Sequence, residues 1–184
     1  MIQIAALLIS SLLTLSCSTV QARESKLPPL KTVAFVDLDR YLGQWYEIAR
    51  YPNSFQKGCD QATAQYSLTD DGDIRVLNTC INLKTKKPQT AEGLATVKDP
   101  FTHAKLKVSF LPPWLRWTGL GRGDYWVIDL ASDYSYSVVS EPKRKYLWIL
   151  SRTATLPADV YQKILDRLTE SGFDIKKLIN SRPQ

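Results

Sequence analysis

The sequence has few of the side chains on which enzymes and metal sites depend. It contains one histidine, three cysteines and one methionine in 184 residues. No Cys-x-x-Cys pair, no second histidine and no Gly-x-Ser-x-Gly elbow occurs, which argues against a zinc site and a serine-hydrolase triad. The one histidine, His103, lies in the turn-like stretch 100–104 and is expected to face solvent. The sequence therefore predicts no metal, no cofactor and no enzymatic activity.

Long apolar runs and basic stripes are also absent. The apolar stretch Ile4–Leu15 is shorter than the roughly 20 residues that span a bilayer. The net charge is +6, but Lys and Arg are scattered among acids in short runs such as Lys84–Lys87 and Lys143–Lys145. Such runs are typical of solvated turns, and no nucleic-acid partner is expected. The glycines of Gly119–Gly123 lack the following lysine of a phosphate loop and favour a turn.

The N-terminal segment predicts export and anchoring. Residues 1–16 contain no charged side chain, and their apolar stretch suits a signal peptide. The stretch ends in Leu-Thr-Leu-Ser-Cys, which resembles the bacterial lipobox and makes Cys17 the expected lipid anchor. Residues 17–36 are then the anchor and tether. With Ser18 after the cysteine, lipoprotein sorting implies the outer membrane, with the domain facing the periplasm. An ordinary cleaved signal, with an incidental Cys17, is the alternative.

The remainder, residues 37–184, predicts one all-β domain. Short segments alternate polar and apolar residues and are separated by turn residues. An eighth strand is expected near Trp45, and no helix separates the strands. These features favour an eight-stranded antiparallel up-and-down barrel, because closure removes exposed edges. The other seven expected strands are 61–69, 74–83, 91–97, 105–111, 125–131, 135–141 and 146–152.

One amphipathic helix follows the strands. Tyr161, Ile164, Leu165 and Leu168 recur at helical spacing and are expected to pack on the barrel wall. Thr155 is the expected N-cap, Pro157 suits the first turn and Gly172 suits the end of the helix.

Cys59 and Cys80 are expected to form a disulfide in an oxidising compartment. Asp71-Gly72 predicts a hairpin between their strands. With Asp70 opposite Asp73, Cys80 would face Thr63, so a bend must bring Cys59 back toward Cys80. If the bridge does not form, a thiol enzyme that uses Cys59 is the alternative.

Alternating apolar positions supply the candidate ligand site. One face of each strand must line the interior, and eight strands enclose room for one small ligand. An interior of aromatic rings with a few hydroxyls suits a long acyl chain with a polar head. A barrel filled by its own side chains, with a structural role in the envelope, is the alternative. The candidate ligand-binding residues are Tyr66, Phe110, Tyr125, Tyr136 and Trp148.

The segment Pro112–Trp117 places two tryptophans and an arginine in one loop. Tryptophan and arginine together favour a membrane interface near the barrel mouth. A loop that folds on its own tryptophans is the alternative.

Three motifs carry a resemblance to a known family. Gly43-Gln44-Trp45 with the residues to Arg50 resembles the first lipocalin signature, Gly123–Val127 the second, and Tyr146–Arg152 the third, with its arginine. Three such motifs in order, followed by one helix, identify the sequence as a member of the lipocalin family over about 37–178. It is most similar to the bacterial outer-membrane lipocalins, which resemble apolipoprotein D.

The resemblance implies roles for these residues. Trp45 and Arg152, with Gly43, would close the barrel floor through a cation-π contact and not touch the ligand. The family implies a lipid carrier of the outer membrane that stores or transports fatty acids or lysophospholipids for membrane maintenance. The expected partners are that lipid and the membrane, with a homodimer left open.

Overall fold

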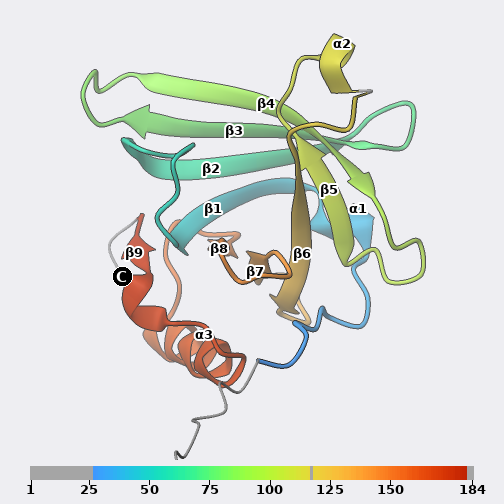
Figure 1. Cartoon of the computed structure of the whole chain (residues 1–184). Helices are drawn as coiled ribbons and strands as arrows, with labels where there is room; N and C mark the ends of the chain where they lie inside the picture. Colours follow the sequence, from blue (N-terminus) through green and yellow to red (C-terminus); the bar gives the residue numbers. More distant parts are fainter. Residues whose placement is uncertain (1–26, 117, 182–184) are drawn as a thin grey trace, which may run out of the picture.

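The computed structural model describes residues 27–116 and 118–181, and β-strands are its main secondary structure. Figure 1 shows strands wrapped around one interior, with one long helix outside the wall. The strands are β1 Gly43–Arg50, β2 Cys59–Leu68, β3 Ile74–Asn82, β4 Pro88–Val97, β5 Lys105–Ser109, β6 Arg122–Leu130, β7 Tyr136–Ser140, β8 Leu147–Ser151 and β9 Ile179–Asn180.

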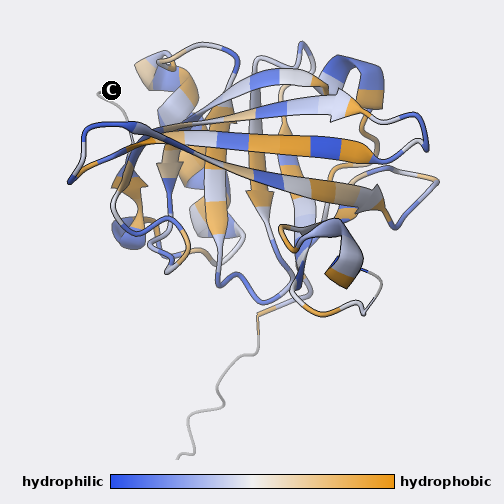
Figure 2. Cartoon of the chain, turned by 90° about the horizontal axis from the view of Figure 1, so that it is seen from above, coloured by the Kyte–Doolittle hydropathy of each residue, from blue (hydrophilic) through white to orange (hydrophobic). Residues whose placement is uncertain are grey.

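Eight of these strands close the predicted barrel. Each of β1 to β8 pairs with its neighbour in antiparallel fashion, and β1 closes the ring by pairing with β8 as well as with β2. Hydrophobic and hydrophilic colours alternate along the strands in Figure 2, as expected for strands with one face toward an apolar interior and the other toward solvent. The barrel prediction is confirmed. The sequence did not predict β9, which has two residues and pairs with the end of β1.

Three strands, β2, β4 and β6, begin two or three residues earlier than predicted. β4 starts at Pro88 and β6 at Arg122, because their hairpin partners extend the ladder. Gly123, which the sequence assigned to a turn, pairs opposite Val108 within this ladder.

The β2–β3 hairpin brings the two cysteines together. Its turn holds three residues, 70–72, between Thr69 and Asp73, and Gly72 adopts φ +80°. Thr63 therefore lies opposite Thr79, one residue from the predicted partner Cys80. A register shift between Asp60 and Thr63 supplies the predicted bend.

Cys59 and Cys80 are joined by the predicted disulfide, with their Cα atoms 5.5 Å apart. In the chain-entropy model, a loop of this length adds about 3 kcal/mol to the free energy of unfolding.

The predicted helix is α3, Ala158–Glu170, and it covers the outside of β7 and β8 (Figure 1). Ile164 and Leu168 are buried in a second apolar cluster that includes Val138 and Ile149. The predicted cap Thr155 is wrong, because the N-cap is Pro157 and has no side-chain hydrogen bond. The shorter helical elements are α1 Leu38–Tyr41, α2 Pro113–Arg116 and the 3₁₀ turn η1 Ile175–Lys177. Among the described residues, no helix is long and apolar enough to cross a membrane.

Residues 27–36, which the sequence assigned to the tether, lie against the barrel. Val36 is fully buried, and its amide donates to the carbonyl of Thr102 at 2.8 Å. Leu30 is buried in the same apolar cluster as Ile164 and Leu168 of α3. All strands and both apolar clusters follow residue 29, so the described chain from Leu27 contains a complete core. The expected signal peptide and Cys17 lie outside the described residues.

Candidate ligand cavity

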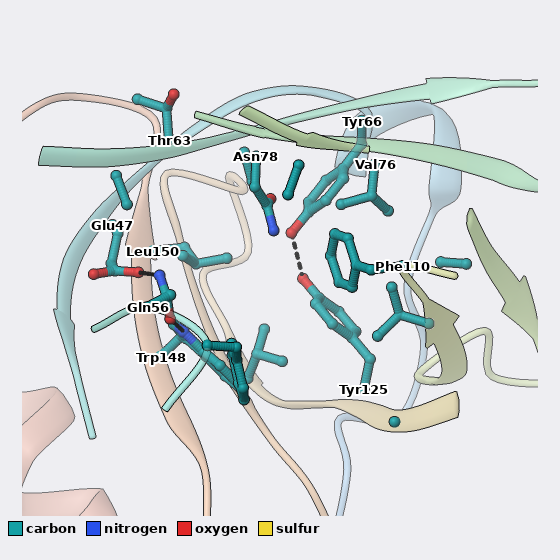
Figure 3. A pocket seen from close by; sticks show the side chains of 18 of the residues that line it. Glu47, Gln56, Thr63, Tyr66, Val76, Asn78, Phe110, Tyr125, Trp148 and Leu150 are labelled. Carbon is teal, nitrogen blue, oxygen red and sulfur yellow. Dashed lines mark hydrogen bonds between the residues drawn. The ribbon is translucent and has the colours of Figure 1, made fainter. Parts of the chain in front are cut away.

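The barrel is hollow, in contrast to the alternative of a filled core. Its cavity has a volume of about 470 Å³ and is lined mainly by apolar side chains from all eight barrel strands, α1 and the connecting loops. This is roughly three times the 150 Å³ cavity that holds benzene in an engineered protein. Tyr66, Phe110, Tyr125 and Trp148 line the cavity as the sequence predicted (Figure 3).

Tyr136 does not line the cavity, so its assignment as a ligand contact is a correction. It shares the outer face of β7 with Val138, whereas Val139 faces inward. The Arg167 guanidinium of α3 donates to the Tyr136 hydroxyl at 2.9 Å and pairs with Asp129 at 2.8 Å. Alternation correctly placed Tyr136 and Val138 on one face, but the position of α3 decides that this face is the outer one.

Inside the cavity, three tyrosine hydroxyls form a chain. The Tyr125 hydroxyl lies 2.9 Å from that of Tyr41 and 3.0 Å from that of Tyr66, and Tyr41 also bonds Ser137 at 2.8 Å. Figure 3 shows Tyr66 and Tyr125 meeting across the cavity. Four hydroxyl protons serve three mutual bonds, so one proton is not used within this chain of hydroxyls. Tyr41 and Ser137 were missed because the pairing depends on closure of the barrel.

Burial raises the pKa of Tyr41 to about 12, and it also raises the pKa values of Tyr66 and Tyr125. Hydrogen bonds from Ser137 and Tyr125 oppose part of the shift at Tyr41. The cavity therefore holds neutral hydroxyls at physiological pH and disfavours a negative charge at this depth.

This shift predicts a loss of stability in alkali. Above pH 10.0, the ordinary pKa of tyrosine, the unfolded chain releases the Tyr41 proton before the folded protein does. The contribution of Tyr41 is therefore complete below pH 10 and is lost as the pH rises toward 12. The free energy of unfolding of the parent, measured with denaturant, should fall more steeply over this interval than that of a Tyr41→Phe protein. Equal slopes would contradict the assignment.

A second polar cluster lies where β1 and β2 separate. Their pairing ends at Tyr46 and Thr63, and Glu47 lies just beyond it. Glu47 is buried and accepts hydrogen bonds from the Gln56 amide at 2.7 Å and from the Ser181 hydroxyl. The Arg50 guanidinium pairs with the same carboxylate at 3.1 Å.

Gln56 connects this cluster to the predicted residue Trp148. The Trp148 indole donates to the Gln56 side-chain oxygen at 2.9 Å, and both residues line the cavity with Glu47 (Figure 3). Sequence reasoning missed Glu47 and Gln56. The available signal was a carboxylate two residues after Trp45, on the face that alternation turns inward.

Aromatic side chains surround the open end of the cavity. The rings of Phe55, Tyr146 and Trp148 lie 5.5 to 6.2 Å apart, centre to centre. In the predicted membrane loop, Trp114 is 70% exposed. Trp114 therefore projects into solvent, whereas Trp117, the second tryptophan of this loop, lies outside the described residues.

At the closed end, Trp45 and Arg152 meet as predicted. The guanidinium carbon lies 3.8 Å from the Trp45 ring centre, and the same side chain donates to the carbonyls of Arg40 and Gln44. Gly43 adopts φ +91°, and a Cβ there would lie 3.4 Å from Arg152. Neither Trp45 nor Arg152 lines the cavity.

The described residues contain no group of three or more His, Cys, Asp or Glu side chains that could hold a metal. The turn residue His103 contacts Phe35 and lies 3.2 Å from the carbonyl oxygen of Val36. Cys59 lines the cavity, but its sulfur is bonded to Cys80.

The chain is similar in sequence to several known proteins. The chain is 43% identical over 162 residues to the outer membrane lipoprotein Blc of Escherichia coli K12, covering 87% of this chain and 88% of that protein. It is 41% identical to temperature-induced lipocalin-1 of Arabidopsis thaliana, covering 81% and 80%. It is 36% identical to apolipoprotein D of Mus musculus, covering 77% and 74%.

Solved structures share the fold at lower identity. Insecticyanin of Manduca sexta aligns with a TM-score of 0.66 and 20% identity, over 86% of this chain and 87% of that one. The model of the lipocalin-like domain matches residues 36–183, which include the barrel, the cavity and α3. With this match and relatives above 40% identity, the chain belongs to the lipocalin family.

Proposed function

We propose that this lipocalin binds a single-chain lipid, a fatty acid or a lysophospholipid, and stores or transports it at the outer membrane for membrane maintenance. The observation that supports this proposal is the hollow apolar cavity of about 470 Å³. It has polar side chains both deep in the barrel and near its open end. Similarity to outer membrane lipoproteins supports the location. In the proposal Cys17 carries the lipid anchor and the domain faces the periplasm.

The size of the cavity favours one acyl chain. A chain of 16 carbons gains about 0.8 kcal/mol for each buried methylene, or roughly 12 kcal/mol before ordering costs. Micromolar binding needs about 8 kcal/mol, so the gain leaves a margin for these costs. A lipid with two chains would need roughly twice the apolar volume and should bind more weakly.

The polar groups favour a ligand with one polar end. The Tyr125 hydroxyl and its neighbours can bind a neutral oxygen deep in the barrel. Gln56 and Glu47 lie nearer the open end of the cavity, beside Trp148. A charged head group is therefore expected at the mouth, where it keeps contact with water.

The proposed role is binding without catalysis. A thiolate is the reactive form of cysteine, and the disulfide to Cys80 leaves none at Cys59. This supports binding over the thiol-enzyme alternative.

Native mass spectrometry of residues 27–184 tests the proposal. The protein is measured after purification and after mixing with palmitate, a 16-carbon lysophospholipid and the matching two-chain phospholipid. We expect one molecule of either single-chain lipid per protein, with a dissociation constant at or below the micromolar range, and weaker binding of the two-chain lipid. Failure of both single-chain lipids to bind below about 100 micromolar (roughly 5.5 kcal/mol) would reject the carrier role.

A further inference from the structure

The open end of the barrel combines exposed apolar side chains with positive charge. Because the strands are antiparallel, the β1–β2, β3–β4, β5–β6 and β7–β8 connections lie at one end, which we call the mouth. Phe55 and Phe110 belong to these connections, line the cavity and are 61% and 44% exposed, so the cavity opens at the mouth.

Large apolar groups project from this end. Trp114 in α2 and Leu120 after it are each 70% exposed, and Phe55 is 61% exposed. Figure 1 shows α2 extending beyond the ends of β5 and β6. Together with Leu83, which is 47% exposed, these side chains come from three of the four mouth connections. The opposite end also exposes Phe101, so the apolar side chains indicate an interaction surface at the mouth only together with its charge.

The charge at the two ends has opposite sign. The mouth connections, 51–58, 83–87, 110–121 and 141–146, contain eight Lys or Arg and one acid, Glu141. The connections at the other end, 69–73, 98–104 and 131–135, contain five Asp and one Lys. The partner of the mouth must therefore be negatively charged and apolar beneath its surface.

The positive charges are available to a partner. Among the described residues, no ion pair involves a lysine of the mouth connections. Glu141 is occupied by the backbone amides of Lys143 and Lys145. Arg116 donates to the carbonyl of Leu111, and Arg144 turns away, because its guanidinium donates to the carbonyls of Pro28 and Ser171.

That contact also places the start of the folded chain. Pro28 lies against Arg144 of the β7–β8 connection, so the segment that carries Cys17 joins the domain beside the mouth. In the proposed anchored form, the roughly ten residues between Cys17 and Leu27 reach at most about 36 Å. The mouth is the end of the barrel whose β7–β8 connection contacts Pro28.

We propose that the mouth docks on the surface of a bilayer rich in anionic phospholipid. Trp114 and Leu120 enter the interface, and Lys84, Lys87 and Lys143 contact the head groups. Docking places the cavity opening against the leaflet, so that a lipid passes between membrane and barrel without crossing water. A second copy of the chain fits this surface poorly, because two mouths would face each other with like charge.

Vesicle sedimentation of residues 27–184 tests docking without the anchor. The parent should bind vesicles of phosphatidylglycerol and phosphatidylcholine at least tenfold more tightly than vesicles of phosphatidylcholine alone, and added salt should weaken this binding. A Lys84→Glu/Lys87→Glu/Lys143→Glu protein should bind the anionic vesicles roughly 100-fold more weakly, since each lysine contributes about fivefold. A Trp114→Ser/Leu120→Ser protein should lose roughly tenfold or more.

The matched control lies at the opposite end. Phe101 is 87% exposed there, and a Lys98→Glu/Phe101→Ser protein should bind anionic vesicles within about twofold of the parent. Equal binding of the parent to both vesicle types, or equal loss in the control and mouth variants, would overturn docking. A parent that dimerises through the mouth and ignores vesicles would overturn it in favour of a second copy.

Membrane docking and lipid carriage can be tested independently of each other. None of the five substituted mouth residues lines the cavity, so every variant should keep the parent's affinity for monomeric lysophospholipid and its thermal unfolding. Vesicle docking with no lysophospholipid bound would reject the carrier role alone.

Discussion

A Val76→Trp protein should bind a single-chain lipid at least 100-fold more weakly than the parent. Val76 lies on β3, is 5% exposed and points into the cavity beside Tyr66 and Phe110 (Figure 3). An indole at this position would occupy space that the acyl chain needs. A 100-fold loss corresponds to about 2.7 kcal/mol, the value of three or four buried methylenes. Titration with a fluorescent fatty acid, followed by displacement with lysophospholipid, measures the change.

The neighbouring residue supplies the control. Leu77 lies on the opposite face of the same strand and is 38% exposed. A Leu77→Trp protein should therefore bind lipid as the parent does. Because Val76→Trp fills an existing hole, it should unfold near the temperature of the parent. Unchanged affinity in a folded Val76→Trp protein would mean that the lipid binds elsewhere.

Replacement of Trp45 by alanine should lower the free energy of unfolding by about 3–5 kcal/mol. Trp45 is fully buried, its indole donates to the carbonyl of Tyr41 at 2.8 Å, and Arg152 covers its ring. Since many domains are stable by only about 5–15 kcal/mol, this loss would bring the barrel near its limit. Urea unfolding monitored by circular dichroism measures it.

Replacement of Arg152 distinguishes a structural role of this residue from a role in ligand binding. An Arg152→Ala protein should lose about 1–2 kcal/mol, through the cation-π contact and two carbonyl partners, while it keeps its lipid affinity. Arg152→Lys should recover little, because an ammonium cannot reproduce the planar contact and the two directed bonds. Lost affinity with unchanged unfolding would make Arg152 a ligand contact.

The barrel and its closed end follow from local patterns. Period-two alternation identified the strands, and three motifs placed Trp45 and Arg152 at one end. The hairpin turn predicted the Cys59–Cys80 bridge, although its register depended on whether two or three residues made the turn.

The interior was predicted only in part, because alternation divides a strand into two faces without saying which face is inside. Tyr66 and Tyr136 satisfy the same pattern, yet one lines the cavity and α3 covers the other. Glu47 and Gln56 meet only because β1 and β2 separate beyond Tyr46. Such contacts between distant segments depend on closure of the barrel, which no local pattern contains.

The central claim is that the acyl chain of a lipid lies inside the barrel. A crystal structure of residues 27–184 with a lysophospholipid that carries bromine along its acyl chain tests this claim directly. We expect anomalous bromine density between Tyr66, Tyr125 and Val76, with the head group near Gln56 at the mouth. Bromine density found only on the outer surface, with ordered water filling the cavity, would contradict it.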